Sequence, residues 1–152
     1  MVVFTEGRVI MRDILFKGKV IISEEWVEGS LVILSENDYR IVTKYDLECA
    51  YTSGIIYDGD MTRVDPSTIC QYTGLTDKNG NKIWENDIVS FLDFYCTDNG
   101  YAESWCIGKV LWDEETVSFQ VTERLSAESY EVLGDCKVIG NIFDNPELLK
   151  GE

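Results

Sequence analysis

Hydrophobic and polar residues alternate most regularly in the segment TVSFQVT, residues 116–122. Val117, Phe119 and Val121 occupy every second position, and polar residues fill the positions between them. Because successive side chains of a strand point to opposite faces, this period of two predicts a half-buried strand. The segment WCIGKVLW, residues 105–112, comes before it, and the acidic turn 113–115 separates the two. The pattern therefore predicts a β-hairpin.

Further short hydrophobic segments follow the same rule along the chain. EWVEGSLVIL and YRIVTK surround the turn formers of residues 35–38, which predicts a second hairpin. Strands are also expected at 55–57 and 61–64, from residue 88 toward Cys96, and in CKVIGNIF near the C-terminus. Several short strands separated by turn signals favour a small barrel over an open sheet.

The stretch QYTGLTDKNGNKIWENDIV, residues 71–89, contains the strongest turn signal. Asn79-Gly80 is the dipeptide that supplies two positive φ angles in a tight type I′ hairpin turn. Residues 85–87 predict a second turn directly after Ile83 and Trp84. At the C-terminal end, DNPELLK predicts one or two turns of helix, with Asp144 or Asn145 as the cap and proline at the first helical position.

The composition agrees with a mainly β protein. The chain has 14 Val and 14 Ile but only three Ala among its 152 residues. β-Branched residues pack well on pleated sheets, whereas alanine is the best helix former.

The formal net charge is −15, with 28 acidic and 13 basic residues. Such a surface repels phosphate groups, so we expect no direct binding of nucleic acid or membrane. The five cysteines show no regular spacing, and we expect them to be buried free thiols. The N-terminal residues lack the pattern of a signal peptide, and we expect a cytoplasmic protein.

The residues present exclude several kinds of chemistry. The chain has no histidine, which excludes the Ser-His-Asp and Cys-His arrangements of nucleophilic enzymes. Residues 77–81 open like a calcium loop, but Lys82 and Ile88 stand where that loop requires Gly and Glu. Close acidic pairs such as Glu114-Glu115 are expected on solvated turns. The sequence therefore predicts a protein that is not an enzyme and holds no metal or cofactor.

The four tryptophans, Trp26, Trp84, Trp105 and Trp112, either fill the core or line a partner-binding face. The core is the favoured interpretation, for Trp112 in particular, whereas Trp84 lies beside turns and is expected to be partly exposed. A partner protein would then meet the turns of residues 77–87. The candidate partner-binding residues are Tyr72, Asp77, Trp84, Glu85 and Asp87.

The chain resembles a known family. TICQYTGLTDKNGNKIWENDIV, GKVLWD and the closing VIGNIFDNPELL are similar to the YopX protein family of phages and prophages, and MRDILFKGK and EWVEGSL match its opening. The resemblance spans roughly residues 11–149, with residues 94–105 as variable loop material. It implies an SH3-like barrel in the C-terminal part, and no established activity or catalytic residues.

We therefore expect residues 1–10 to be an extension and residues 11–150 to form one YopX-like domain. Within that domain we expect an N-terminal β subdomain at 11–68, with additional antiparallel strands, an SH3-like barrel at 69–143 and a short helix at 144–150. The expected function is that of a phage-derived, non-catalytic interaction protein with an unidentified protein partner, and self-association is an alternative. A second hypothesis is an acidic DNA mimic that inhibits a nucleic-acid-binding host protein.

Overall fold

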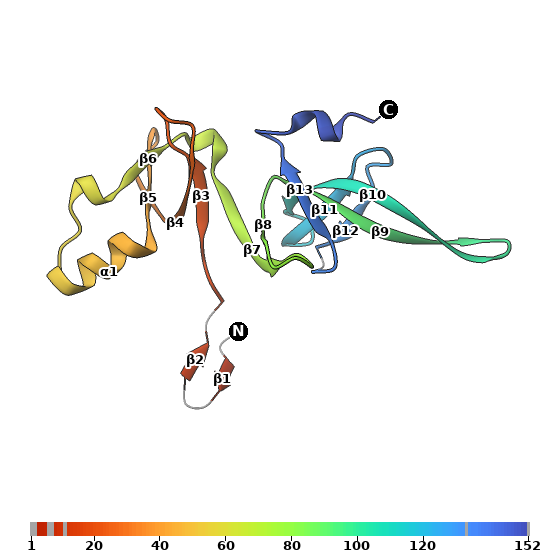
Figure 1. Cartoon of the computed structure of the whole chain (residues 1–152), viewed down its shortest axis with the longest axis horizontal. Coiled ribbons are helices and arrows are strands. Elements are labelled where there is room, and N and C mark those ends of the chain that lie inside the picture. Colours follow the sequence, from red (N-terminus) through yellow and green to blue (C-terminus); the bar gives the residue numbers. More distant parts are fainter. Residues whose placement is uncertain (1–2, 6–7, 11, 133, 152) are drawn as a thin grey trace. The chain divides into compact units, whose positions relative to one another are not determined.

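The structure is a computed structural model that describes residues 3–5, 8–10, 12–132 and 134–151. It is mainly β, as the composition predicts, and every strand pair whose register the structure describes is antiparallel. The chain divides into two compact units, residues 1–74 and 75–152. Figure 1 labels the elements of both units.

Unit 1 contains the strands of the N-terminal half. They pair in the order β6-β5-β4-β3-β7, and β7 runs on into the first residues of unit 2. The strands are β3 (Phe16–Lys19), β4 (Trp26–Ser35), β5 (Asp38–Val42), β6 (Thr62–Val64) and β7 (Cys70–Thr76). Ile41, Val42 and Val64 are almost completely buried, and they form the centre of this unit's core. The predicted hairpin of residues 25–44 is confirmed as β4 and β5.

Two further strands lie near the N-terminus. β1 (Val3–Thr5) and β2 (Arg8–Ile10) pair only with each other, in a sheet of their own. The expected boundary at residues 10 and 11 lies outside the described residues, because Met11 is not among them.

Helix α1 (Lys44–Ser53) is an element that the strand pattern did not predict. The Thr43 hydroxyl accepts the backbone N–H of Asp46, and Gly54 ends the helix in the left-handed conformation. A Thr cap and a C-terminal Gly are ordinary helix signals. Residues 55–57, expected to be a strand, form none, and two short 3₁₀ helices follow at η1 (Asp58–Asp60) and η2 (Pro66–Thr68).

Unit 2 contains β8 (Lys82–Trp84) and a five-stranded antiparallel sheet in the order β12-β11-β10-β9-β13. Its strands are β9 (Asp87–Thr97), β10 (Gly100–Asp113), β11 (Ser118–Glu123), β12 (Ser129–Glu131) and β13 (Lys137–Asn141), and η3 (Pro146–Leu149) follows. The described strands form no closed barrel, so the SH3-like closure is not confirmed.

The core of unit 2 is a compact hydrophobic cluster. Ile83, Val89, Val110, Val121, Val132 and Cys136 are buried together, and Phe91, Phe119 and Val138 pack against them. The predicted hairpin is confirmed, because Val110 pairs with Val121 and Trp112 with Phe119. Trp112 nevertheless remains 42% exposed, so the prediction that it belongs to the core is wrong.

Val117 also departs from the alternation that predicted β11. It lies in the turn before the strand, 70% exposed, with a φ of +52°. The short turn after Asp113 must reverse the chain within four residues, and it takes Val117 out of the strand before the ladder begins.

Asn79-Gly80 forms a hairpin turn, but not of the predicted type. Gly80 has a φ of +81°, whereas Asn79 is not among the described non-glycine residues with positive φ. The Gly80 N–H donates to the Asp77 carbonyl, which makes a type I turn followed by one left-handed residue. The prediction is therefore right for Gly80 and wrong for Asn79.

Candidate functional site

The sequence-predicted partner residues are mostly buried. Four of them expose less than a tenth of their surface: Tyr72, on β7 of unit 1, and Asp77, Trp84 and Asp87, in unit 2. Glu85 is half-buried. The expectation that Trp84 is partly exposed is wrong, because Trp84 is only 5% exposed. Its backbone N–H donates to the Asp87 carboxylate at 2.8 Å, so the second predicted turn folds against β8. Binding of a partner at these five residues stays a prediction.

The buried carboxylate of Asp77 stabilises the turn at residues 77–81 through hydrogen bonds. Its Oδ1 accepts the backbone N–H groups of Asn79 and Asn81, at 2.9 and 2.8 Å. Its Oδ2 accepts the N–H of Val138 on β13 at 3.0 Å. Burial opposes the charged form, but these hydrogen bonds outweigh it and hold the pKa of Asp77 below its ordinary value.

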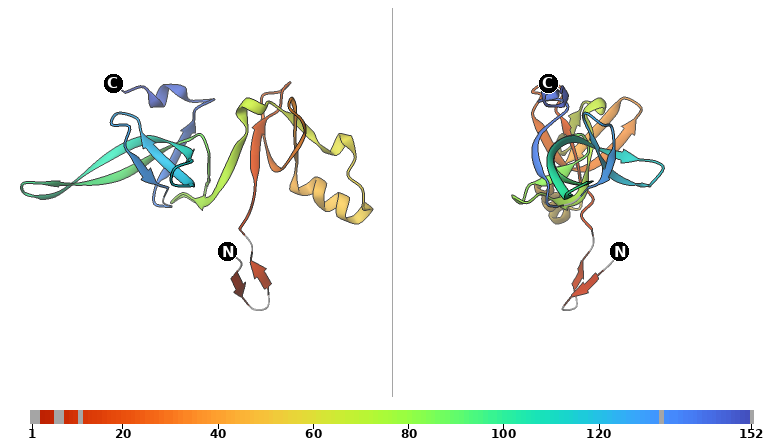
Figure 2. Two further views of the ribbon diagram at one scale, coloured as in Figure 1. Left: turned by 180° about the vertical axis from the view of Figure 1, so that it is seen from behind. Right: turned by 90° about the vertical axis from the view of Figure 1, so that its right-hand side faces the viewer.

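The most prominent accessible feature of unit 2 is the far end of the β9–β10 hairpin. β13 pairs with β9 only over residues 87–90, and β11 pairs with β10 only over residues 108–113. We call residues 91–106, which pair only with each other or form the turn between the strands, the arm. Figures 1 and 2 show the arm as a two-stranded ribbon that runs beyond the other strands of its sheet. Residues 94–105, expected to be loop material, are therefore regular strand except for the turn at residues 98 and 99.

Aromatic side chains are exposed along the arm. Phe94, Tyr101 and Trp105 are 64%, 84% and 64% exposed, and Tyr95 is also exposed. Phe94 pairs with Glu103, Tyr101 with Cys96 and Trp105 with Leu92, so the three rings lie on one face of the ribbon. The expectation that Trp105 fills the core is wrong, because its strand continues past the end of the core.

Lys78 connects the Asp77 turn with this aromatic face. Its Nζ lies 5.3 Å from the centroid of the Trp105 ring, within the range of a cation–π contact. Sequence reasoning selected the turn at residues 77–81 but not Trp105, the aromatic residue that the turn reaches. The alternation of β10 on its own did not indicate where the sheet ends and the arm begins.

The register shows which backbone groups the arm leaves open. The Ile107 carbonyl accepts the Arg124 N–H, so the backbone N–H and C=O groups of Ile107 point away from β9. Because these groups alternate in direction along a strand, those of every second residue before Ile107 in β10 also point away from β9. On β9 the alternation then turns the N–H and C=O groups of Leu92, Phe94 and Cys96 outward. Among the described residues, no backbone group of another strand pairs with these edge positions.

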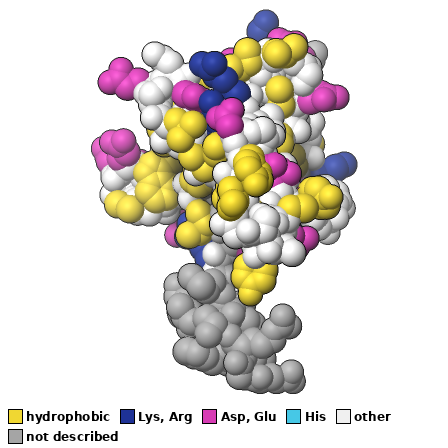
Figure 3. Space-filling model, turned by 90° about the vertical axis from the view of Figure 1, so that its left-hand side faces the viewer, with side chains coloured by type: hydrophobic (Ala, Val, Ile, Leu, Met, Phe, Trp, Pro, Cys, Tyr) yellow, Lys and Arg dark blue, Asp and Glu magenta, His cyan; other side chains and the backbone are white. Residues whose placement is uncertain are grey.

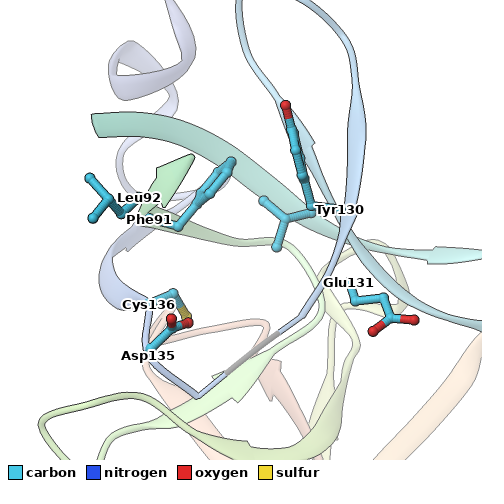
Figure 4. Close-up of a pocket in the computed structure, with 7 residues that line it drawn as sticks. Phe91, Leu92, Tyr130, Glu131, Asp135 and Cys136 are labelled. Carbon is cyan, nitrogen blue, oxygen red and sulfur yellow. The ribbon is translucent and has the colours of Figure 1, made fainter. Parts of the chain in front are cut away.

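A small cavity lies where the arm leaves the sheet. It has a volume of about 90 Å³, and Phe91, Leu92, Val121, Tyr130, Glu131, Asp135 and Cys136 line it. Figure 4 shows the rings of Phe91 and Tyr130 on one side and Cys136 with Asp135 on the other. The two ring centroids are 5.2 Å apart, and the Tyr130 hydroxyl donates to the carboxylates of Asp93 and Glu128. The cavity is therefore lined by apolar and aromatic side chains together with the acidic Glu131 and Asp135.

The cysteines do not gather into a site. All five are free, and Cys70 and Cys136 are buried, whereas Cys49 and Cys96 are exposed. The expectation of buried thiols is thus right for two and wrong for these two. Burial, together with the nearby Asp77 and Asp135 charges, raises the pKa of Cys136 to about 11. In the described part of the chain, no three acidic or cysteine side chains are placed to hold a metal ion.

Unit 1 has an apolar surface of its own. Tyr45, Leu47 and Tyr51 of α1 are exposed, and so are the residues of the following segment, Ile55, Ile56 and Tyr57. Figure 3 shows hydrophobic side chains gathered in groups on the face that it views, with acidic side chains around them. No described helix of either unit is long and apolar enough to cross a membrane.

Comparison with known proteins identifies the class of this chain. The model of the YopX protein family matches residues 15–150, so the chain belongs to the YopX family. A solved structure, protein EF1440 from Enterococcus faecalis, is similar over 92% of this chain and 100% of its own, with a TM-score of 0.51 and 20% identity. At that identity the likeness concerns the fold alone. No curated protein matches the chain.

Proposed function

We propose that this YopX protein is a non-catalytic interaction protein of phage origin that binds a protein partner through the aromatic face of its arm. The observation that carries the proposal is the exposure of Phe94, Tyr101 and Trp105 on one face of a ribbon whose backbone pairs with no further strand of the described chain. Large aromatic side chains dominate the binding energy of protein interfaces. The lack of histidine in the sequence supports the non-catalytic part.

The arm extends the hypothesis drawn from the sequence. That hypothesis placed the partner at the turns of residues 77–87, and Lys78 of the first turn lies over Trp105. Asp77 is buried and acts on the binding face through the turn that carries Lys78. An SH3-like arrangement of unit 2 belongs to the same proposal, supported by the hydrogen bonds that join the Asp77 turn to the outer edge of β13. A cytoplasmic location also stays a prediction.

A DNA mimic would display its carboxylates in place of phosphates. In unit 2, however, Asp77, Asp87 and Glu123 are buried and accept backbone N–H groups. These acids stabilise turns, and they are not available to an external partner. These three are a small part of the 28 acidic residues, so the preference between the two hypotheses rests on the exposed aromatic face of the arm and not on the charge. We therefore favour the arm.

A pull-down from host lysate tests the proposal. The protein, an arm variant (Phe94→Ser, Tyr101→Ser, Trp105→Ser) and a unit 1 control (Ile22→Ser, Tyr51→Ser, Tyr57→Ser) are compared at low and at high salt. All six positions are exposed, so both variants should fold, which a thermal melt verifies. We expect the protein and the control to retain a partner at both salt concentrations, and the arm variant to lose it.

Two results would contradict the proposal. One is a partner that the arm variant retains as well as the unchanged protein does. The other is a set of nucleic-acid-binding proteins that high salt removes from all three forms, which would support the DNA mimic instead, because screening weakens exposed charge pairs.

A further inference from the structure

The outer edge of β9 in the arm has the properties of a site for an added strand. Leu92, Phe94 and Cys96 direct their N–H and C=O groups outward, and no strand of the described chain pairs with them. Natural sheet edges are often protected by charged side chains, lysine above all, by proline, by a bulge or by a covering element. The sequence of this edge, FLDFYCT at residues 91–97, contains no lysine or proline and a single charged residue, Asp93, and its pairing with β10 is regular.

The position of β13 shows where an added strand would begin. β13 pairs with β9 up to the Lys137–Ser90 pair, and the edge becomes free at the next residue. The cavity lies at this point, since Phe91 and Leu92 line it from β9 and Cys136 lines it from the residue before β13. A strand added along the free edge would therefore reach the cavity at one end.

The charges of this region select the chemistry of the partner. The arm contains Asp93, Asp98 and Glu103 and no basic residue, and the cations beside it are Lys78, over Trp105 on the aromatic face, and Lys137, at the end of β13. The exposed Glu131 and Asp135 are among the residues that line the cavity. A second copy of the chain would bring the same acids and a net charge of −15 to the contact, which opposes self-pairing. A basic segment complements these charges.

We propose that the free edge of β9 binds an extended basic segment of the partner protein as an added antiparallel or parallel strand. One lysine or arginine of that segment places its aliphatic stem in the cavity beside Phe91 and Val121, and its charged end near Glu131 or Asp135. Long basic side chains bury their stems while the charged group stays in water. The inference rests on the proposed function and names the partner class of the same arm.

Synthetic peptides test this inference with the full chain. The probe is a short acetylated peptide of alternating lysine and valine, with binding measured by calorimetry. A glutamate–valine peptide tests the charge, and a lysine–valine peptide with alternate N-methylated amides tests the strand hydrogen bonds. We expect only the first peptide to bind well, about tenfold or more tightly than either of the others. Its binding should weaken as salt rises, because the peptide lacks the aromatic contacts that hold the whole partner at high salt.

Two matched pairs of variants identify the edge. Cys96→Pro removes an outward N–H from the β9 edge, whereas Cys96→Val keeps it. Glu103→Pro removes an outward N–H from the β10 edge. Its control is Glu103→Gln, which removes the same charge but keeps the N–H. We expect Cys96→Pro to lower the affinity about tenfold relative to Cys96→Val, and Glu103→Pro to bind as Glu103→Gln does. Asp135→Asn should weaken the lysine–valine peptide.

Each contrary outcome has a clear meaning. Equal binding of the N-methylated peptide, or equal loss at both edges, would overturn strand addition along β9. Absence of lysine–valine binding while the arm still retains a partner from lysate would overturn this inference and leave the proposed function standing. Dimers that strengthen as salt rises would show that a second copy covers the edge, which also overturns it.

Discussion

The carboxylate of Asp77 accepts the backbone N–H of Val138 at 3.0 Å, although the two residues are 61 positions apart in the sequence. The same carboxylate holds the turn that places Lys78 over Trp105. One buried side chain thus joins the hairpin turn, the outer edge of β13 and the aromatic face of the arm.

Replacing Asp77 by Asn should therefore destabilise unit 2 in a pH-dependent way. The pKa of Asp77 is below its ordinary value of 3.8, so the unfolded chain binds this proton more readily than the folded one. The stability that the carboxylate contributes is present above the ordinary pKa and is lost as the pH falls through the folded pKa. We expect Asp77→Asn to lower the free energy of unfolding by about 1–3 kcal/mol at neutral pH.

Urea denaturation over a range of pH measures this effect. The difference between the protein and Asp77→Asn should shrink in acid, below the ordinary pKa. Asp98→Asn removes the same charge in the exposed turn of the arm and should change stability by no more than about 0.5 kcal/mol. A difference for Asp77→Asn that stays constant with pH would contradict the lowered pKa.

Gly80 should tolerate no β-branched side chain. Its φ of +81° lies in the left-handed region, and no atom lies within 4 Å of the place where a Cβ would stand. A loss of stability in Gly80→Val would thus come from the backbone alone, and we expect about 1–3 kcal/mol. The control is Gly59→Val, where the space is equally open and φ is outside that region. Equal melting temperatures for the two variants would count against the turn.

Val117 offers the opposite experiment, because a β-branched residue occupies a left-handed position there. Asparagine adopts this conformation at lower cost than valine does. Since Val117 is exposed, Val117→Asn removes little buried surface. We expect the free energy of unfolding to rise by about 1 kcal/mol. The same change at the exposed Ile33 in β4, Ile33→Asn, should stabilise nothing, and a similar gain there would refute the explanation by φ.

Thiol labelling should separate the five cysteines by burial. In the folded protein, Cys49 and Cys96 should react rapidly with an alkylating reagent. Cys70 and Cys136 should react only after unfolding, and the raised pKa of Cys136 slows its reaction further. Mass spectrometry after denaturation without reductant should find five labels, and a missing pair would show a disulfide.

The parts of the fold that the sequence predicted are those with local causes. The hairpin around Asp113 and the pairing of β4 with β5 follow from alternation and turn residues. Helix α1 was missed because its hydrophobic residues show no helical period, and only Thr43 and Gly54 marked its ends. The burial of Trp84 and the exposure of Trp105 depend on where neighbouring strands end. That information lies in residues far away in the sequence.

In the arm, the residues available to bind a partner are largely separate from the residues that stabilise the fold, whereas at most protein surfaces the same residues do both. Apart from Phe91, which packs against the core, and Asp93, which accepts the Tyr130 hydroxyl, its residues pair mainly with one another and contribute little to the stability of unit 2. Substitutions on its aromatic face, or two extra residues in each strand, would preserve the pairing register and leave the sheet intact. A lineage of such proteins can thus exchange one partner for another by altering this ribbon, while the rest of the chain remains as it is.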